Sequence, residues 1–174
     1  MRPAAEERSD AAFDLSRLNP GEFLGFGGSV LLFASLFMPW FSTSCDANRK
    51  PKGCNVNSTL HGQRGEFTAW QTFSKLDILL TLACIAPFIL AWIVVRGHAL
   101  SWRPGEVTMI VGMVAAALIL LNGVILGKPG GSASVGISLE YGWFVGLLGA
   151  IGILAGGLLR QAIGARARKP PGVI

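Results

Sequence analysis

The sequence predicts an all-α membrane protein, an antiparallel bundle of four transmembrane helices with both termini in the cytoplasm and one larger external loop. Two observations predict this class. Of the 174 residues, 51% are hydrophobic and only 14% are charged, whereas globular domains carry about 25% charged residues. Four long stretches contain no charged residue at all: residues 23–41, 78–95, 107–126 and 141–159.

Each stretch is about as long as a helix that crosses a bilayer. A hydrocarbon core of roughly 30 Å needs about 20 helical residues at about 1.5 Å each. Because hydrocarbon offers the backbone no hydrogen bonds, each stretch is expected to be helical. The predicted spans are residues 23–41, 76–96, 106–127 and 141–160, within a transmembrane domain covering residues 21–160.

The placement of Lys and Arg predicts the orientation, because cytoplasmic segments of membrane proteins carry an excess of both. With the N-terminus inside, nine of the 15 basic residues lie on the cytoplasmic side. Residues 1–20 are then a cytoplasmic N-terminal segment, and residues 161–174 are a basic cytoplasmic tail. The expected location is the plasma membrane, with the lipid bilayer as the first partner.

Local motifs mark where the first two spans begin and end. Asn19 followed by Pro20 is typical of a helix start, and the first span is expected to leave the membrane at Pro39–Phe41. In the external loop, residues 42–74, the spacing of Thr68 and Gln71 predicts a capping box and a short interfacial helix, and Ser74 has the same spacing to Asp77. Residues 127–139 are rich in Gly and Ser and predict a flexible loop.

The external loop contains two cysteines, Cys45 and Cys54, separated by eight residues. An oxidising exterior would allow them to form a disulfide. Cys84 falls inside the second span and is expected to behave as a small buried hydrophobic residue.

Aromatic and basic residues supply the candidates for contact with a partner. Aromatic residues near the external ends of the spans are typical of the membrane interface; they are Trp40, Phe41, Trp70, Phe73, Tyr141 and Trp143. The external loop also carries a short basic run. The residues predicted to contact a protein partner are Trp40, Arg49, Lys50, Lys52 and Trp70.

An acidic residue stands at the N-terminal end of every predicted span: Glu22, Asp77, Glu106 and Glu140. The partial positive charge of a helix N-terminus favours an acid there, and this interpretation is sufficient for all four. No Asp, Glu, Lys, Arg or His falls inside any of the four charge-free stretches, which argues against a proton relay or ion-coupled transport.

Small residues recur along the third and fourth spans at helical spacing. Such stripes allow two helix backbones to approach closely. Two interpretations remain open, packing within the bundle and contact between copies in a homo-oligomer. The residues predicted to pack helices together are Gly112, Ala116, Gly142, Gly146, Gly149, Gly152 and Gly156.

No combination of residues predicts an enzyme or a cofactor site. His61 and His98 lie on opposite sides of the predicted membrane, and Cys45, Cys54 and His61 give at most three zinc ligands at spacings unlike zinc fingers. No nucleophile and base occur together on one face. We therefore expect no catalytic residue, no metal, no cofactor and no nucleic-acid partner.

Three motifs carry a resemblance to a known group: residues 19–22, residues 38–41 and residues 69–77. There the chain resembles small four-span membrane proteins of high-GC Gram-positive (actinobacterial) bacteria, which implies the four-span fold over residues 19–160 and no particular activity. A looser similarity is to claudin-type tetraspans, in which a Trp precedes a Cys pair, as Trp40 precedes Cys45 and Cys54. The Gly-Leu-Trp of claudins is absent here, so only the architecture is similar.

The function expected from the sequence is therefore non-enzymatic. The chain is predicted to be an accessory or scaffolding subunit that presents its external loop to a partner protein. The alternative is a small oligomeric channel or carrier for an apolar or small solute, assembled through the glycine stripe; the absence of buried ionisable residues counts against it.

Overall fold

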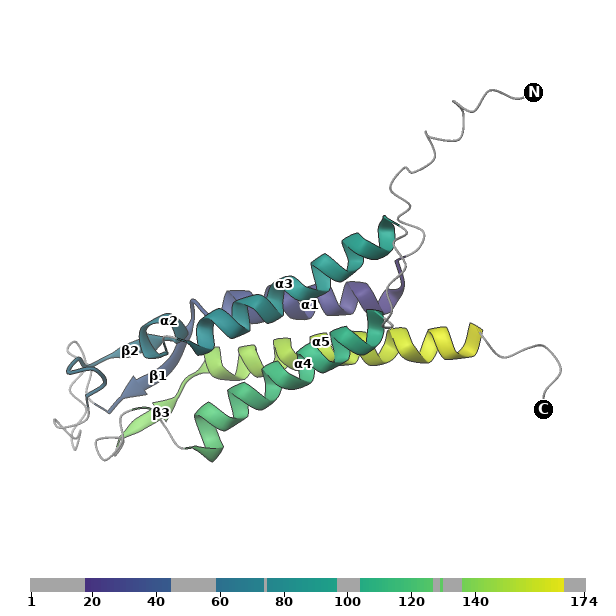
Figure 1. Ribbon diagram of the computed structural model, residues 1–174. Helices are drawn as coiled ribbons and strands as arrows, with labels where there is room; N and C mark the ends of the chain where they lie inside the picture. Colours follow the sequence, from purple (N-terminus) through teal and green to yellow (C-terminus); the bar gives the residue numbers. More distant parts are fainter. Residues whose placement is uncertain are drawn as a thin grey trace, which may run out of the picture.

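The computed structural model describes residues 18–44, 59–73, 75–96, 104–126, 129 and 136–167. Four long helices lie alongside one another, and a small sheet lies at one end of them (Figure 1). The elements in chain order are α1 (Pro20–Ser35), β1 (Pro39–Thr43), β2 (Glu66–Thr68), α2 (Ala69–Thr72), α3 (Leu76–Val95), α4 (Pro104–Leu120), a π-helical turn (Leu121–Ile125), β3 (Ile137–Leu139) and α5 (Tyr141–Ala167).

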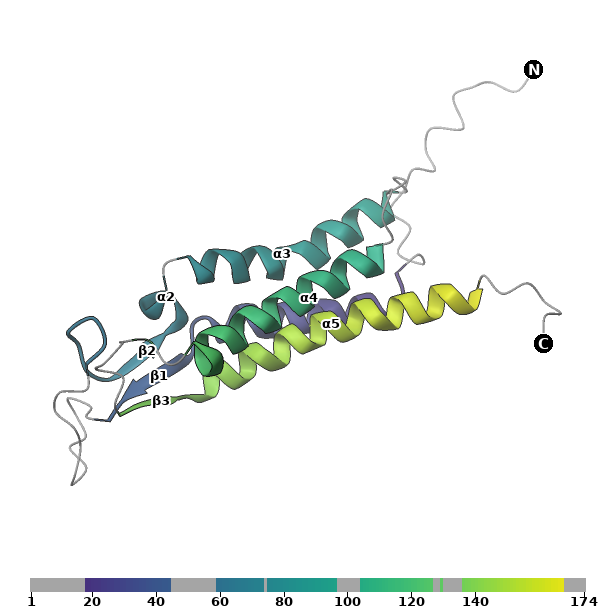
Figure 2. The same cartoon turned by 60° about the horizontal axis from the view of Figure 1, so that its bottom comes forward.

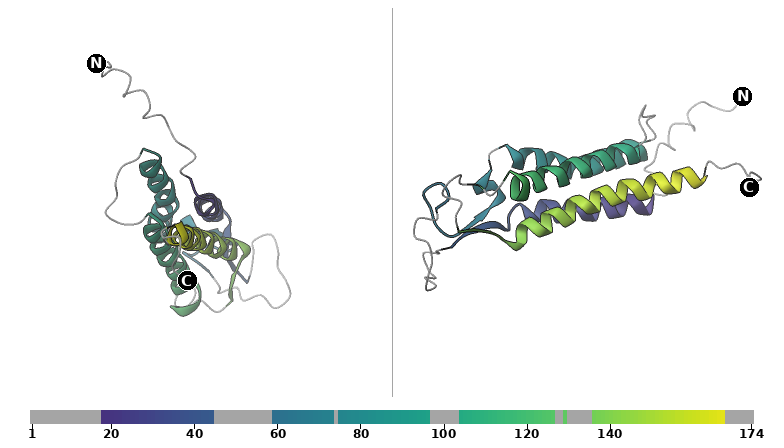
Figure 3. Two further views of the ribbon diagram at one scale, coloured as in Figure 1. Left: turned by 90° about the vertical axis from the view of Figure 1, so that its right-hand side faces the viewer. Right: turned by 90° about the horizontal axis from the view of Figure 1, so that it is seen from below.

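Three helices of the described chain are long and apolar enough to cross a membrane: Leu76–Val95, Gly105–Ile125 and Tyr141–Gly164. The fourth long helix, α1, has 16 residues. Helix α5 makes its most extensive contacts with α1 and α4, and α3 closes the arrangement through smaller contacts with the same two helices (Figures 2 and 3). We call the end that carries the strands the sheet end, and the end where α1 begins and α5 ends the terminal end.

Glycines bring the backbones of α1 and α5 into direct contact. A Cβ atom built on Gly28 would lie 2.6 Å from the Ile153 nitrogen, and one on Gly149 would lie 2.5 Å from the Leu32 nitrogen. Near the terminal end, a Cβ on Gly156 would lie 2.6 Å from the Gly21 oxygen. These contacts run along the two helices in opposite chain directions. The pair is therefore antiparallel and in contact along nearly all of α1.

Glycines also bring the backbones of α4 and α5 into close contact, on another side of α5. A Cβ on Gly112 would lie 2.3 Å from the Leu154 nitrogen, and one on Gly157 would lie 2.4 Å from the Met109 nitrogen. The residues that the sequence predicted to pack helices together thus lie in contacts within this chain. Gly142 and Gly146 face β1 and the Trp40 ring, Gly152 faces Gly28, and Ala116 is half-buried against the core.

The three strands form an antiparallel sheet in the order β2-β1-β3. Phe41 in the central strand pairs with Phe67 of β2 and Leu139 of β3, and Ser42 pairs with Glu66 and Ser138. Because side chains alternate between faces, Phe41 and Phe67 turn inward, whereas the Ser42 row faces outward. The expectation of an all-α protein is therefore wrong at this end of the molecule.

Two predicted boundaries also change at the sheet end. The first span was expected to continue to residue 41, but α1 ends at Ser35, and hydrogen bonds of the tighter i to i+3 type close its last turn. Pro39 disfavours helical geometry in the residue before it, and the chain then becomes β1. Residues 137–139 of the expected flexible loop form β3, because pairing with β1 satisfies their backbone groups.

The predicted helix starts are confirmed where the structure describes them. A capping box joins Asn19 and Glu22 at the start of α1, and another joins Thr68 and Gln71 at the start of α2. Ser74 lies outside the described residues. Helix α5 continues to Ala167, into the segment that was expected to be a cytoplasmic tail.

We predict that Gly28→Ala destabilises the protein by about 1–3 kcal/mol, because its methyl group would have to push α5 away from α1. Its chain neighbour provides a matched control, since a Cβ on Gly27 meets nothing within 4 Å. Thermal unfolding in mild detergent should show a lower midpoint for Gly28→Ala than for Gly27→Ala. Equal midpoints for the two variants would show that the close backbone contact is not needed.

Candidate functional site

The candidate site is the sheet end, and Trp40 fastens it to the helices. The Trp40 side chain is completely buried, and its indole Nε1 donates a hydrogen bond of 2.7 Å to the Ser35 carbonyl oxygen at the end of α1. Gly142 and Gly146 of α5 leave space for the ring, because Cβ atoms there would lie 2.8 and 2.9 Å from it. One side chain therefore joins β1 to both helices.

The sequence predicted Trp40 as a contact for a partner, whereas the structure buries its side chain completely. A bulge between Pro39 and Phe41 interrupts the pairing of β1 with β2. Such a bulge changes the direction of the side chain it carries, and the ring points into the core. Phe41 and Trp143, two other aromatics expected at the membrane interface, are also buried.

A second buried tryptophan, Trp143, connects α5 to the end of α4. Its indole Nε1 donates a hydrogen bond of 3.3 Å to the Ile119 carbonyl oxygen. Gly123 lies in the π-helical turn that follows α4, and a Cβ there would lie 2.2 Å from the Trp143 Nε1 atom. The π turn and the glycine together let the ring reach the backbone.

The chain between β1 and β2 leaves the sheet and returns to it at one point; we call residues 44–64 the excursion. The Thr43 N–H donates to the Gly65 carbonyl oxygen at 3.0 Å, and the Gly65 N–H donates to Thr43 Oγ1 at 2.8 Å. Within the excursion, a tight turn closed by two backbone hydrogen bonds between Leu60 and Gln63 places Leu60 in the core. The base of the excursion is thus closed and anchored.

The turn between Leu60 and Gln63 contains two residues in the left-handed backbone conformation. His61 and Gly62 both have positive φ, at 50° and 75°, which suits a two-residue hairpin turn. Both residues are exposed, as are Gln63 and Arg64. This part of the excursion therefore faces outward from an ordered base.

Among the other predicted contact residues, the structure describes only Trp70. Trp70 is 43% exposed on α2, directly after β2. It lies against Phe37, two residues after the end of α1, with 6.2 Å between the ring centroids. Three basic candidates and both cysteines of the predicted disulfide lie outside the described residues: Arg49, Lys50, Lys52, Cys45 and Cys54.

A chain of hydrogen bonds fixes β3 beside β1 on the outward face of the sheet. Ser42 Oγ donates to Glu140 Oε1 at 2.5 Å, and the Ser42 and Ser138 hydroxyl oxygens are 2.6 Å apart. The Ser42–Ser138–Glu140 cluster thus holds β3 next to β1 just before α5 begins.

The described residues contain no group of three His, Cys, Asp or Glu side chains that could hold a metal ion.

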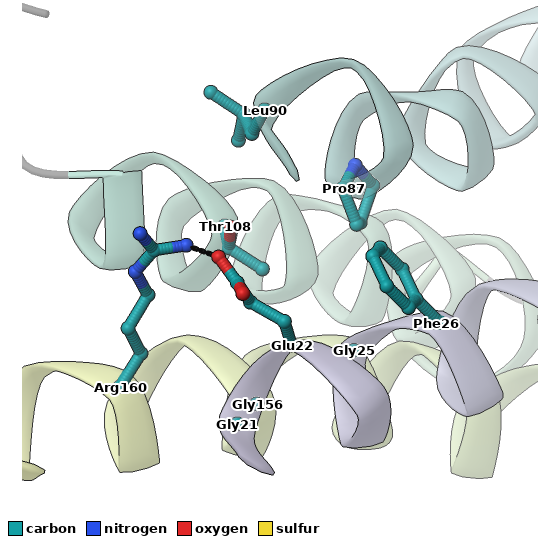
Figure 4. A pocket seen from close by; sticks show the side chains of 9 residues that line it. All are labelled: Gly21, Glu22, Gly25, Phe26, Pro87, Leu90, Thr108, Gly156 and Arg160. Carbon is teal, nitrogen blue, oxygen red and sulfur yellow. Dashed lines mark ion pairs between the residues drawn. The ribbon is translucent and has the colours of Figure 1, made fainter. Parts of the chain in front are cut away.

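A second polar feature lies at the terminal end, where Glu22 and Arg160 form a buried ion pair (Figure 4). The Asn19 N–H donates to Glu22 Oε2 at 3.0 Å, so the carboxylate also caps α1. Figure 4 shows the two side chains meeting between helices beside Thr108, with Phe26 facing Pro87. The cavity there is about 10 Å³, roughly the space that one water molecule needs.

The sequence interpretation placed Glu22 at a helix N-terminus and missed its pairing with Arg160. The missed indication lies in the helical spacing of α5. Gly149, Gly156 and Arg160 follow one another at intervals of seven and four residues, so Arg160 continues the glycine face. Since Gly21 contacts Gly156, its neighbour Glu22 lies next to that cation.

Comparison with known proteins found no matching family model, no matching curated protein and no matching solved structure. The resemblance of the motifs to small four-span proteins therefore stays a prediction.

We predict that Glu22→Gln destabilises the protein, because it leaves the Arg160 cation buried without its counter-charge. The expected loss is at the lower end of roughly 3–5 kcal/mol, since the Arg160 side chain remains 15% exposed. The double variant Glu22→Gln with Arg160→Gln should be less destabilised than the sum of the two single variants. Additive losses in thermal unfolding of the four proteins would show that the pair does not couple.

Proposed function

We propose that this chain is a four-span integral protein of the plasma membrane. The first support is the apolar outer surface of the helices. Large hydrophobic side chains are exposed along all four long helices, among them Phe33 of α1, Leu82 of α3 and Leu148 of α5. An exposed apolar surface of this extent is typical of a protein covered by lipid.

The contact between α1 and α5 supports α1 as the fourth span. With 16 residues, α1 is shorter than the about 20 residues of an average span. It nevertheless lies along α5 from the Gly21–Gly156 contact to the approach of Ser35 and Gly146. A helix held along a spanning helix in this way occupies the same depth.

The orientation we propose places the sheet end outside the cell and both termini in the cytoplasm. Helix α1 begins and helix α5 ends at the same end of the molecule (Figure 1). The distribution of Lys and Arg along the sequence favours that end as the cytoplasmic one. The sheet and the excursion would then face the exterior.

The function that this geometry supports best is non-enzymatic presentation of the excursion to a partner protein. The observation that carries the proposal is the closed base at Thr43 and Gly65, on a sheet fastened to the helices by Trp40. Loops positioned by a rigid scaffold are the segments that proteins use most often for recognition. Exposed Trp70 lies on α2, directly after β2, and is the described candidate for the contact.

The glycine contacts weigh against the alternative of an oligomeric channel or carrier. That hypothesis used the glycine stripe of α5 to join copies of the chain. The glycines at positions 149, 152 and 156 meet α1, and Gly157 meets α4. A stripe that is occupied within the chain offers no surface to a second copy.

We predict that a cysteine placed at Arg64 reacts with a membrane-impermeant maleimide in intact cells. A cysteine placed at Gly164, exposed near the terminal end, should react only after the cells are permeabilised. Both variants would be made with Cys45 and Cys54 replaced by Ser, and that parent protein is the unlabelled control. Labelling of both positions in intact cells would rule out the proposed topology.

We predict that a photo-crosslinking amino acid at Arg64 forms an adduct of one defined mass with a different protein in native membranes. The same group at Leu82, which is 58% exposed on the outer surface of α3, should give no such adduct. Replacing residues 45–58 by a Gly-Ser linker of equal length should abolish the adduct. If the adduct survives that replacement, the excursion is not the surface that the partner recognises.

A further inference from the structure

Asp77 is a carboxylic acid buried in the core at the sheet end. It lies in the first turn of α3 and is 1% exposed. Neither carboxylate oxygen has a hydrogen-bond partner among the residues that the structure describes. Only the backbone of the residue is engaged, since its carbonyl oxygen accepts a hydrogen bond of 2.7 Å from Thr81 Oγ1.

The residues on the same side of α3 make this position apolar. Leu76 and Leu80, one residue before and three residues after Asp77, are both buried. Both belong to the hydrophobic cluster that includes Trp40, Trp143 and Ile119. Asp77 is therefore buried between two residues of the core cluster that also holds the sheet on the helices.

The charges on neighbouring elements do not compensate a carboxylate there. Helices α1 and α4, which pack against α3, each carry one charged residue in their described lengths, Glu22 and Glu106, and both lie at the terminal end. The ionisable side chains nearer the sheet end include exposed His61, Arg64, Glu66, Lys75 and Tyr141. Glu140 also lies there and accepts a hydrogen bond from Ser42. Within the described chain, none of them forms an ion pair with Asp77.

An ionised carboxylate without a partner is strongly disfavoured in such an environment, whereas the neutral acid is tolerated. Acidic residues inside membrane helices are rare for the same reason, and they mark functional positions. The partial charge of the α3 N-terminus favours an anion, but that effect is small compared with the loss of hydration. The folded chain therefore favours Asp77 with its proton.

We propose that Asp77 is a proton-binding site, whose ligand is a proton from the aqueous phase at the sheet end. The O–H bond of the buried acid breaks when the first turn of α3 moves away from the core, and the proton passes to water. The carboxylate left behind is then hydrated. Return of a proton restores the packed arrangement of α3.

The structural effect of proton release at Asp77 is transmitted to the sheet through α2. Helix α2 ends at Thr72, four residues before α3 begins, and it packs against β2 and β1. A movement of the first turn of α3 therefore changes the support of β2, which is the strand at the end of the excursion.

Infrared spectroscopy of the full chain in lipid vesicles tests the protonation directly. Wild-type protein at neutral pH should show the C=O stretching band of a protonated carboxylic acid, and ¹³C-labelled aspartate should shift that band. Asp77→Asn should lack it. The isotope shift needs no variant, so the test holds even where a variant does not fold. Absence of an isotope-sensitive acid band at neutral pH overturns the proposal.

The linked stability gives a second measurement. When a folded state keeps a proton that the unfolded chain has released, stability falls as the pH rises. The thermal midpoint of the wild type should therefore decrease between pH 5 and pH 9, and that of Asp77→Asn should decrease less. Glu66→Gln, which removes an exposed carboxylate at the same end, should retain the wild-type profile. Identical profiles for wild type and Asp77→Asn overturn the proposal.

Discussion

The close approach of α1 and α5 is the constraint on which the rest of the structure depends. Lipid gives helices no hydrophobic reason to associate, so van der Waals contact between their surfaces has to hold them together. Gly28 and Gly149 allow the two backbones to touch, and Gly112 extends the same contact from α4 to another side of α5. This contact also fixes how far along α5 each residue of α1 lies. Glu22 consequently meets Arg160 at one end, and Trp40 meets Gly146 at the other.

The sheet continues this helix pair beyond its end. Strand β1 follows α1 after a short turn, and β3 precedes α5 with only Glu140 between them. Since α1 and α5 are antiparallel neighbours, the strands attached to them are neighbours too, and they pair in antiparallel register. Trp40 and the hydrogen bond from Ser42 to Glu140 then hold the two strands on the helices. The base of the excursion is positioned by the same contacts that position the helices.

The sequence predicts the features that depend on neighbouring residues, and it misses those that depend on distant ones. The apolar runs predict the long helices, and the helix start at Asn19 and the capping box at Thr68 are correct because each depends on residues close together in the sequence. The sheet escapes prediction because strands of three to five residues show too little alternation, and because Ser42 and Ser138 are 96 residues apart. The burial of Trp40 depends on a bulge and on glycines of α5, so the residue looks like an interfacial aromatic in the sequence. The basic run and the cysteine pair of the excursion lie outside the described residues.

Two acidic residues that look equivalent in the sequence differ in their surroundings. Glu22 and Asp77 both lie in the first turn of a long helix, and both are buried. Glu22 has a cation and a backbone N–H as partners, so its charge is compensated and it ties α1 to α5. Asp77 has neither partner within the described chain, so its charge state and its position are coupled. The terminal end is consequently held by a fixed ion pair, whereas the sheet end holds a group that can exchange a proton with water. A conformational response of this protein would therefore begin at α3, whose packing against its neighbours is the least extensive of the long helices.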